Sequence, residues 1–456
     1  MPDYVTNNIT FLNPVGLGFT LLMGFLMIVL PRRYALLPVI LLICYMTMGM
    51  RVIVATFDFT MLRILILFGW ARLILRGEIR SIKLNSIDKA VIWWALAGII
   101  TYTVLWQTYD AFEYKLGVAY TAIGFFFLFR LLLRDLDDVV RVVKMTALFI
   151  VPLAGSILVE KITGRNSFAI FGGVPPVTFV RNGILRCQGP FAHPILAGTF
   201  GATLLPLFVG LWWRGGRGKS LAFWGIASSL TIVVCAASSG PVLAALAGIG
   251  ALCMWPLRKK MRMIRWGVVL ALFALALVMK APVWYIITRL SIFSGSTGWH
   301  RAYLIDRAIK NLPDWWLIGT KSTAAWGRSE HDGLADVTNQ YISEGANGGL
   351  ITMFLFIAII VRGFRGVGHS IEAMEKESRS AQLYLWALGA ALFAHAVNYI
   401  GVSYFDQNLV NWYMLLAMIS TLTGPFLSLR HQAHVLNSQP RPHAEARPHL
   451  LAGIER

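Results

Sequence analysis

Apolar runs recur along the whole chain, and short polar or basic segments separate them. About thirteen of these runs approach the roughly 20 residues that a helix needs to cross a bilayer. None alternates in the manner of a barrel strand, and a spanning segment must satisfy its own backbone hydrogen bonds. The pattern therefore predicts an all-α integral membrane protein with about 12–13 transmembrane helices. The runs fall near residues 13–30, 34–50, 58–75, 90–106, 115–133, 140–158, 190–213, 220–237, 240–256, 265–283, 347–363, 382–402 and 408–428.

Composition supports a membrane protein and argues against a large soluble enzyme. Of the 456 residues, 57% are hydrophobic and 14% are charged, whereas charged residues make up about 25% of an ordinary soluble domain. The net charge of +19 is typical of a nucleic-acid-binding protein or of a membrane protein with basic cytoplasmic loops. The distribution of the basic residues favours the second interpretation, so we expect membrane lipid and no nucleic acid among the partners.

Basic residues concentrate in every second loop between the apolar runs. Under the positive-inside rule these loops are cytoplasmic. The same rule places the C-terminal tail, residues 429–456, inside, and its composition predicts disorder. Thirteen spans would put the N-terminus outside, and twelve would put it inside. The basic loops are residues 31–34, 76–89, 130–144, 214–219, 257–265 and 361–366.

Two long loops then remain on the outer side, near residues 160–190 and 282–346. The first leads into "LRCQGPFAHPILAGTF" and brings Arg181, Arg186 and His193 to the outer face. The second contains "GWHRAYLIDRAIKNLPDWWLIG", in which Arg301 shares the apolar face of a short amphipathic helix that ends near Pro313. A guanidinium on a buried helix face needs a partner. A structural ion pair and an anion site both remain possible.

The next segment, residues 329–356, descends from a polar loop into an apolar helix. It carries acidic side chains, a histidine and asparagine to the outer face, and its glycines suit either close backbone approach or helix packing. Arginine suits bidentate contact with phosphate oxygens, so these loops predict a site for a phosphate-bearing lipid. Within the spans Arg63 is the main charge, either functional or structural. The polar residues that we single out in this segment are His331, Asp332, Asp336, Thr338, Asn339 and Glu344.

Cysteine and histidine usage predicts neither a metal site nor another cofactor. Three of the four cysteines lie inside apolar runs, and the exception is Cys187. The histidines of the C-terminal tail are irregularly spaced. We therefore expect no disulfide framework, no metal and no cofactor.

Four motifs in order, "RCQGPFAHPILAGTF", "SSGPVLAALAG", "WHRAYLIDRAIKNLPDWWLIG" and "DVTNQYISEGANGGLITMFLF", resemble the O-antigen ligase and O-antigen polymerase superfamily. The resemblance covers roughly residues 180–360. It implies a GT-C-like fold in the bacterial inner membrane, with about a dozen spans and a large periplasmic loop containing short amphipathic helices. It also implies a metal-independent glycosyltransferase. The donor would be an undecaprenyl-diphosphate-linked glycan, and the acceptor a glycan or a lipid.

Residue by residue, the resemblance assigns catalytic roles to Arg186 and Arg301, which would bind the diphosphate and stabilise it as it leaves. Arg181 is a further substrate-binding candidate. His193 would orient the loop, bind a sugar or simply begin a helix. The remaining substrate-binding candidates that we draw from the outer segment are His331, Asn339 and Glu344.

The sequence departs from the family at one position. Ligases of this family usually carry a His-Asn pair, with the histidine proposed to activate the acceptor, and the matching pair here is Thr338–Asn339. Threonine is no base near neutral pH. We therefore favour Asp336 as the catalytic base, with His331 and Glu344 as alternatives, and the choice between polymerase and ligase stays open.

These expectations divide the chain into N-terminal transmembrane helices (1–160), a ligase-like core (161–363), C-terminal transmembrane helices (364–428) and the tail (429–456). Two other classes compete with the glycosyltransferase. A transporter or flippase of lipid-linked saccharide predicts inverted repeats and broken helices near the midplane. A non-catalytic scaffold predicts that replacing Arg186 or Arg301 leaves glycan output unchanged.

Overall fold

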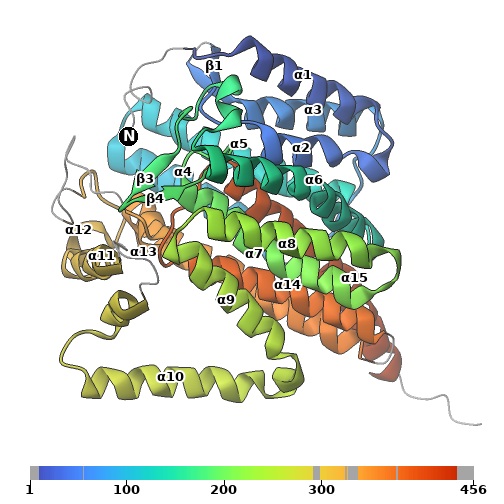
Figure 1. Cartoon of the computed structure of the whole chain (residues 1–456). Coiled ribbons are helices and arrows are strands. Elements are labelled where there is room, and N and C mark those ends of the chain that lie inside the picture. Colours follow the sequence, from blue (N-terminus) through green and yellow to red (C-terminus); the bar gives the residue numbers. More distant parts are fainter. Residues whose placement is uncertain are drawn as a thin grey trace, which may run out of the picture.

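The computed structural model describes residues 10–54, 56–290, 298–323, 326, 337–375 and 378–438, without the side chains of residues 217, 290 and 424–438. These residues form an all-α fold apart from two short hairpins, and most helices run side by side across the molecule (Figure 1). The helices are α1 (Pro14–Val29), α2 (Leu37–Tyr45), α3 (Met61–Leu75), α4 (Ser86–Trp106), α5 (Tyr109–Leu132), α6 (Leu136–Thr163), α7 (Pro194–Arg214), α8 (Lys219–Cys235), α9 (Ser239–Cys253), α10 (Met261–Val278), α11 (Gly298–Lys310), α12 (Leu312–Trp315), α13 (Gln340–Ala373), α14 (Arg379–Asn398) and α15 (Gln407–Ser438). Short 3₁₀ turns are η2 (Arg32–Tyr34), η3 (Ser167–Phe171), η4 (Gly216–Gly218), η5 (Trp255–Lys260) and η6 (Val283–Leu290).

Within the described residues, 7 helices are long and apolar enough to cross a membrane. They are α4, α5, α6, α7, α13, α14 and the segment Trp255–Val278, which includes α10. The expectation of an all-α membrane protein is confirmed, although fewer helices than 12–13 meet this criterion. Each of the thirteen apolar runs does contain a helix, and three of the remaining helices, α1, α8 and α9, are apolar but shorter.

Helix α2 shows why some spans are shorter than the apolar runs predict. It has 9 residues and is about 14 Å long. The chain then continues as an irregular, almost fully buried stretch from Met46 to Met50. At Arg51 it pairs with Phe11, just before α1. Helix and stretch together match the roughly 30 Å of a bilayer core, and non-helical backbone is tolerated there because protein surrounds it.

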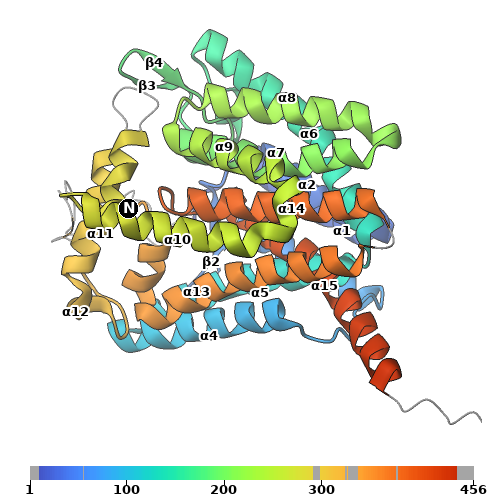
Figure 2. The ribbon, with the colours of Figure 1, turned by 90° about the horizontal axis from the view of Figure 1, so that it is seen from below.

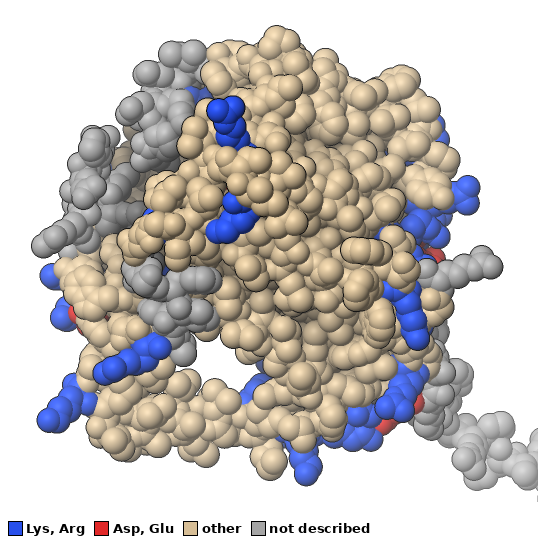
Figure 3. All heavy atoms as spheres, viewed as in Figure 1, with Lys and Arg blue, Asp and Glu red and all other residues tan. Residues whose placement is uncertain are grey.

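The loops that we expected to be cytoplasmic gather at one end of the bundle. Arg32 pairs with Asp138 at 2.7 Å, which joins the loop after α1 to the start of α6. Other contacts join further basic loops at this end: Arg80 to Leu133 O, Arg214 to Asp137, and Arg362 to Ser86 O. Figure 3 shows most Lys and Arg of this view toward the right and lower edges, with a broad uncharged surface between.

Helix α7 forms the centre of the bundle and packs against α8, α9 and α14 (Figure 2). Its glycines allow this, because a Cβ at Gly210 would lie 2.5 Å from Ala387. Buried amide–hydroxyl bonds also hold the centre together. Asn398 of α14 donates to Thr199 at 3.0 Å, and Asn411 of α15 donates to Thr203 at 3.1 Å.

Helix α13 is broken near its outer end. Gly348 and Gly349 leave helical geometry, and Gly349 has φ 76°. The segment after α12 fills the break, because Thr320 N–H donates to Ala346 O at 2.8 Å and Leu350 N–H donates to Trp316 O at 2.8 Å. The break therefore docks the large outer loop onto a spanning helix.

Helix α10 lies apart from the bundle. None of its residues is buried, and among the described elements it packs mainly on the short segments η5 and η6 that connect it. Figure 1 shows it below the main body of the molecule, and in Figure 2, seen from below, it crosses in front of the bundle.

Candidate functional site

A β-hairpin presents two of the predicted arginines on one face. Strands β3 (Phe179–Arg181) and β4 (Ile184–Arg186) pair with Phe179 opposite Arg186 and Arg181 opposite Ile184. Side chains two residues apart along a strand share a face, and cross-strand partners share it too. Arg181 and Arg186 therefore project from the same side of the hairpin.

The segment after β4, residues 187–189, is held in place by hydrogen bonds to α6 and α8. Glu160, at the outer end of α6, accepts hydrogen bonds from the backbone N–H of Gln188 (3.1 Å) and Gly189 (2.8 Å). Cys187 N–H donates to Cys235 O at the end of α8. The Arg186 guanidinium lies 5.8 Å from the centre of the Phe179 ring, and the residue is only 5% exposed. Arg186 is therefore fixed before any ligand binds.

Helix α11 delivers Arg301 from the other outer loop. Its apolar face packs into a small separate core with α12 and α13, made of Leu304, Ala308, Trp315, Trp326, Ile342 and Ala346. Arg301 lies on this buried side, as predicted, and is 8% exposed. Its guanidinium lies against two glycines. A Cβ at Gly401 would be 3.1 Å from Cζ, and one at Gly240 would be 3.4 Å from Nη2.

The three arginines converge, and the part of the chain that the structure describes places no carboxylate beside them. Burial lowers the pKa of Arg186, and the positive charges of Arg181 and Arg301 lower it further. Burial likewise lowers the pKa of Arg301, with Arg181 adding to the effect. Buried Nε atoms of Arg186 and Arg301 have no hydrogen-bond partner among the described residues. An unpaired cluster of buried cations is costly, so the arrangement is complementary to an anion with several oxygens.

His193 borders this cluster and begins α7. Its Nδ1 accepts a hydrogen bond from Ile195 N–H at 3.1 Å, as an N-cap does. Burial lowers its pKa to about 4, helped by Arg186 and Arg181. His193 is therefore neutral near pH 7, with the proton on Nε2. Of its predicted roles, the structure supports the start of a helix.

Two helix N-termini add to the positive potential. Helix α7 begins at His193, and the first turn of α9 contains Gly240, which lies against Arg301. The N-terminal end of a helix carries a partial positive charge and favours anions. Together with three guanidinium groups, these ends make this surface suited to an anion.

Other predicted residues lie elsewhere. Asn339 caps α13 by accepting from Ile342 N–H, and it donates to Ile400 O at 3.0 Å. Its role is therefore structural. Glu344 lies one turn into α13 and faces Lys115 rather than an arginine. Asp336 and His331 fall outside the described residues.

Arg63 has a structural explanation. Its guanidinium donates to Asp58 O and to Thr121 Oγ1, and Tyr120 OH donates to its carbonyl. These bonds join the hairpin of β1 (Arg51–Val54) and β2 (Phe57–Thr60) to α5.

Sequence reasoning missed the hairpin that carries two of the arginines. The signal was present, since Asn182-Gly183 separates two short runs of β-formers, and both residues have positive φ (50° and 74°). It also missed Asp406, in the turn between α14 and α15 that contains Gly401. Burial raises the pKa of Asp406 to about 7, within the range of a general base.

The site thus offers rigid, preformed stabilisation of negative charge at the outer end of the bundle. Among the described residues no cluster of His, Cys, Asp and Glu is suited to hold a metal ion. Comparison with protein-family models and with curated proteins finds no match for this chain.

Proposed function

We propose that the protein is a membrane glycosyltransferase of the O-antigen ligase or polymerase type. It acts at the periplasmic face of the bacterial inner membrane. Its donor is an undecaprenyl-diphosphate-linked glycan, and its acceptor is a glycan or a lipid. The observation that carries the proposal is the convergence of Arg181, Arg186 and Arg301, with no carboxylate among the described residues to neutralise them.

The chemistry of the proposed reaction needs such a cluster. An acceptor hydroxyl attacks the anomeric carbon of the donor sugar, and the bond from that carbon to the phosphate oxygen breaks. The diphosphate leaves with the electron pair, and a base takes the hydroxyl proton. Cations fixed where negative charge develops on the leaving group lower the barrier. Asp336 remains our proposed base, and Asp406 is a second candidate because its raised pKa allows it to take up a proton near pH 7.

Binding of the leaving group tests the proposal directly. The purified protein in nanodiscs would be titrated with undecaprenyl diphosphate, for Arg186→Gln, Arg301→Gln and the wild type. Loss of one charged hydrogen-bonding group is expected to weaken binding about 10- to 100-fold. Arg165→Gln is the matched control, since Arg165 is exposed in the same outer loop. Equal affinities for all four proteins would contradict the proposal.

A deletion strain then distinguishes the two enzyme types. Single repeat units that accumulate on the carrier, with loss of long chains, would identify a polymerase. Long chains that persist on the carrier without reaching an acceptor would identify a ligase. Unchanged amounts of carrier-linked saccharide and of long chains would contradict both the polymerase and the ligase assignment.

One observation favours the alternative, a transporter or flippase of lipid-linked saccharide. Broken helices are a feature of transporter sites, and α13 is broken at Gly348 and Gly349. However, the backbone of residues 316–320 fills this break, which gives it a structural reason. Under the alternative, loss of the protein would trap the lipid-linked saccharide on the cytoplasmic leaflet, which a membrane-impermeant glycosidase would reveal.

A further inference from the structure

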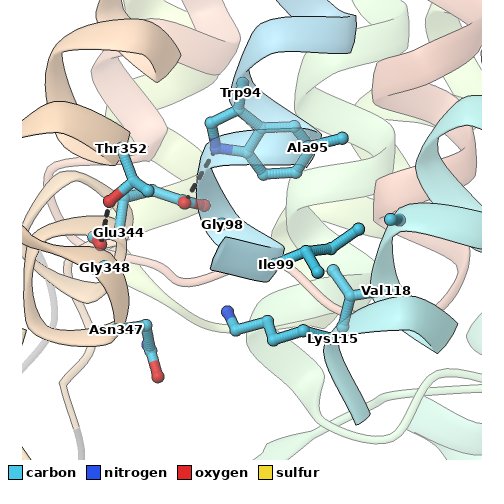
Figure 4. A pocket seen from close by; sticks show the side chains of 11 residues that line it. Trp94, Ala95, Gly98, Ile99, Lys115, Val118, Glu344, Asn347, Gly348 and Thr352 are labelled. Atoms are coloured by element: carbon cyan, nitrogen blue, oxygen red, sulfur yellow. Dashed lines mark hydrogen bonds between the residues drawn. The ribbon is translucent and has the colours of Figure 1, made fainter. Parts of the chain in front are cut away.

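The cavity between α4, α5 and α13 leaves no room for a further ligand. Lys115 extends from α5 toward Glu344 of α13 across it, and Trp94 Nε1 donates to Glu344 at 2.9 Å (Figure 4). The space between these side chains holds about one water molecule. A larger partner of this protein therefore has to meet its exterior.

Residues 161–186 form an apolar and purely basic surface at the outer end of the molecule. They lead from the end of α6 through the β3–β4 hairpin, and they contain four Lys and Arg and no Asp or Glu. An exposed apolar surface on a folded protein marks an interaction site. The large apolar side chains that are exposed here are Ile162 (76%), Val177 (67%), Val180 (53%), Phe179 (49%) and Ile184 (36%).

The hairpin exposes apolar side chains on both of its faces. Val180 and Leu185 are cross-strand partners on one face, whereas Ile184 lies opposite Arg181 on the other. Val180 and Ile184 are both exposed, so near the turn neither face is fully covered by the described residues. A two-stranded hairpin is at best marginally stable in water. A hairpin that is apolar on both faces therefore fits surroundings that are themselves apolar.

Hydrogen bonds attach this hairpin to the outer end of α6. Thr178 N–H donates to Gly164 O at 2.9 Å, directly after the helix ends, and Lys161 Nζ donates to Leu185 O at 2.5 Å. Figure 2 shows the hairpin at the edge of the bundle, beyond the ends of the neighbouring helices. The depth of the hairpin in a bilayer is therefore set by α6, which is long and apolar enough to cross that bilayer.

The exposed apolar side of α6 leads directly to this surface. Leu148, Val159 and Ile162 are exposed. Val159 and Ile162 follow Leu148 by 11 and 14 residues, close to three and four helical turns, so the three side chains share one face. An exposed apolar face of a spanning helix contacts lipid, and here it continues up to the point where the hairpin is attached.

We propose that the β3–β4 hairpin and its connection to α6 insert into the outer boundary of the bilayer, between the lipid headgroups and the first part of the acyl chains. The apolar side chains contact the acyl chains, and the basic residues contact anionic headgroups. Lysine and arginine suit this depth because their apolar stems reach from hydrocarbon to the charged layer. The proposal needs only a chain that spans a membrane, so it is independent of the proposed glycosyl transfer.

A protein partner is the competing explanation for an exposed apolar surface. Two observations favour lipid. The surface continues the exposed side of a spanning helix, where lipid is already the neighbour. Its charge also has a single sign, which matches a layer of anionic headgroups along its whole length.

Spin labels measure the depth of the hairpin directly. Val180→Cys and Ile184→Cys would each be made in a Cys253→Ser background, because Cys253 is the exposed cysteine and the other three are buried. The labelled full-length proteins would be reconstituted in nanodiscs of phosphatidylethanolamine and phosphatidylglycerol. Power saturation then compares collisions with oxygen, which concentrates among acyl chains, and collisions with a nickel chelate, which stays in water.

We expect oxygen collisions to exceed chelate collisions at Val180→Cys and Ile184→Cys. The reference for lipid is Val159→Cys, on the exposed face of α6, and should give the same result. The reference for water is Asp314→Cys, an exposed acidic position in the other outer loop, where the ratio of the two collision rates should be reversed.

A matched pair of substitutions tests whether the apolar side chains hold the hairpin in the lipid. Val180→Asp adds a charge within the apolar surface, whereas Asn182→Asp adds the same charge at the polar turn. A charged side chain is costly among acyl chains, so Val180→Asp should shift the label at Ile184→Cys toward the chelate. Asn182→Asp should leave that label unchanged, since aspartate also tolerates the φ of 50° at this position.

Two results would overturn the proposal. If the labels at Val180→Cys and Ile184→Cys collide with the chelate as often as the label at Asp314→Cys does, the hairpin lies in water. If they are shielded from both reagents, protein covers the surface, and in nanodiscs that protein is a second copy of this chain. Binding of undecaprenyl diphosphate is measured separately, so either result would leave the proposed function standing.

Discussion

The guanidinium of Arg301 lies against the backbone of Gly401, so closely that an added Cβ would be 3.1 Å from its Cζ and Nε. Gly401 belongs to the turn between α14 and α15, whereas Arg301 belongs to the large outer loop. The contact fixes the position of a cation that has no carboxylate partner within the described ranges. It makes the turn part of the arginine site.

Gly401→Ala should therefore displace Arg301 by a few tenths of an ångström. We expect about a tenfold loss of affinity for undecaprenyl diphosphate with little change in thermal stability, since a small shift weakens a charged hydrogen bond worth about 1.5–3 kcal/mol. Gly240→Ala is a graded control, because its Cβ would lie 3.4 Å from Arg301 Nη2. It should therefore reduce the affinity less than Gly401→Ala does. A larger effect at Gly240 would contradict this account.

Gly183→Ala tests whether the hairpin positions its arginines. Gly183 has φ 74°, and its Cβ would meet nothing within 4 Å, so the change acts only through backbone strain of about 1 kcal/mol. Affinity for undecaprenyl diphosphate should fall about fivefold. Gly155→Ala should leave affinity unchanged. An unaffected Gly183→Ala protein would show that the turn does not control Arg181 and Arg186.

His193→Asn should make the protein less sensitive to acid. The pKa of His193 is lowered from 6.5 to about 4 in the folded protein. Between these values the unfolded chain binds more protons, so this residue lowers stability as the pH falls. Asparagine keeps an N-cap without titrating. Scanning calorimetry across this pH range should show a smaller decrease in Tm for the variant, and parallel curves would contradict the assignment.

Asp406→Asn should have the opposite pH dependence. The pKa of Asp406 is raised from 3.8 to about 7 in the folded protein. Between these values the folded protein binds more protons, so the residue stabilises at low pH and that contribution is lost as the pH rises toward 7. Asparagine also tolerates the φ of 54° at this position. The difference in Tm between variant and wild type should therefore change with pH in the direction opposite to that for His193→Asn.

Gly349→Ala tests the docking of the outer loop at the break in α13. An added Cβ would lie 2.2 Å from Leu317 O, at a residue with φ 76°. The clash and the strain together should cost more than about 2 kcal/mol. We expect a lower Tm and faster tryptic cleavage between residues 298 and 323. Gly368→Ala, in the same helix but with open space at its Cβ, should behave as the wild type.

The apolar pattern predicted where helices occur along the chain, but it predicted only partly where each helix begins and ends. Runs of apolar residues locate α4 and α7 well, because length and hydropathy are local properties. The same pattern overestimates α2, since the buried stretch from Met46 to Met50 is as apolar as a helix. It underestimates α5 and α13, which begin at Tyr109 and Gln340, several residues before the apolar runs expected at 115–133 and 347–363.

The sequence predicted only those features of the candidate site that depend on which side of the membrane a loop lies. Alternation of basic loops placed Arg186 and Arg301 on one side of the membrane, and the structure brings their side chains into one cluster. Lys115 and Glu344 face each other across a cavity although they are far apart in the sequence. Only the packing of α5 against α4, and of α4 against α13, places them there, and no local pattern encodes such packing.

Helix α10 has no buried residue, so its tilt is set by the surrounding lipid and not by the protein. A thinner bilayer would be accommodated by tilting this helix at a cost of only fractions of a kcal/mol per ångström of mismatch. Its outer end leads into η6, which packs on α11, the helix that carries Arg301. The lipid around α10 therefore lies only one short segment, η6, away from the helix that carries Arg301, whose guanidinium is held by Gly240 and Gly401.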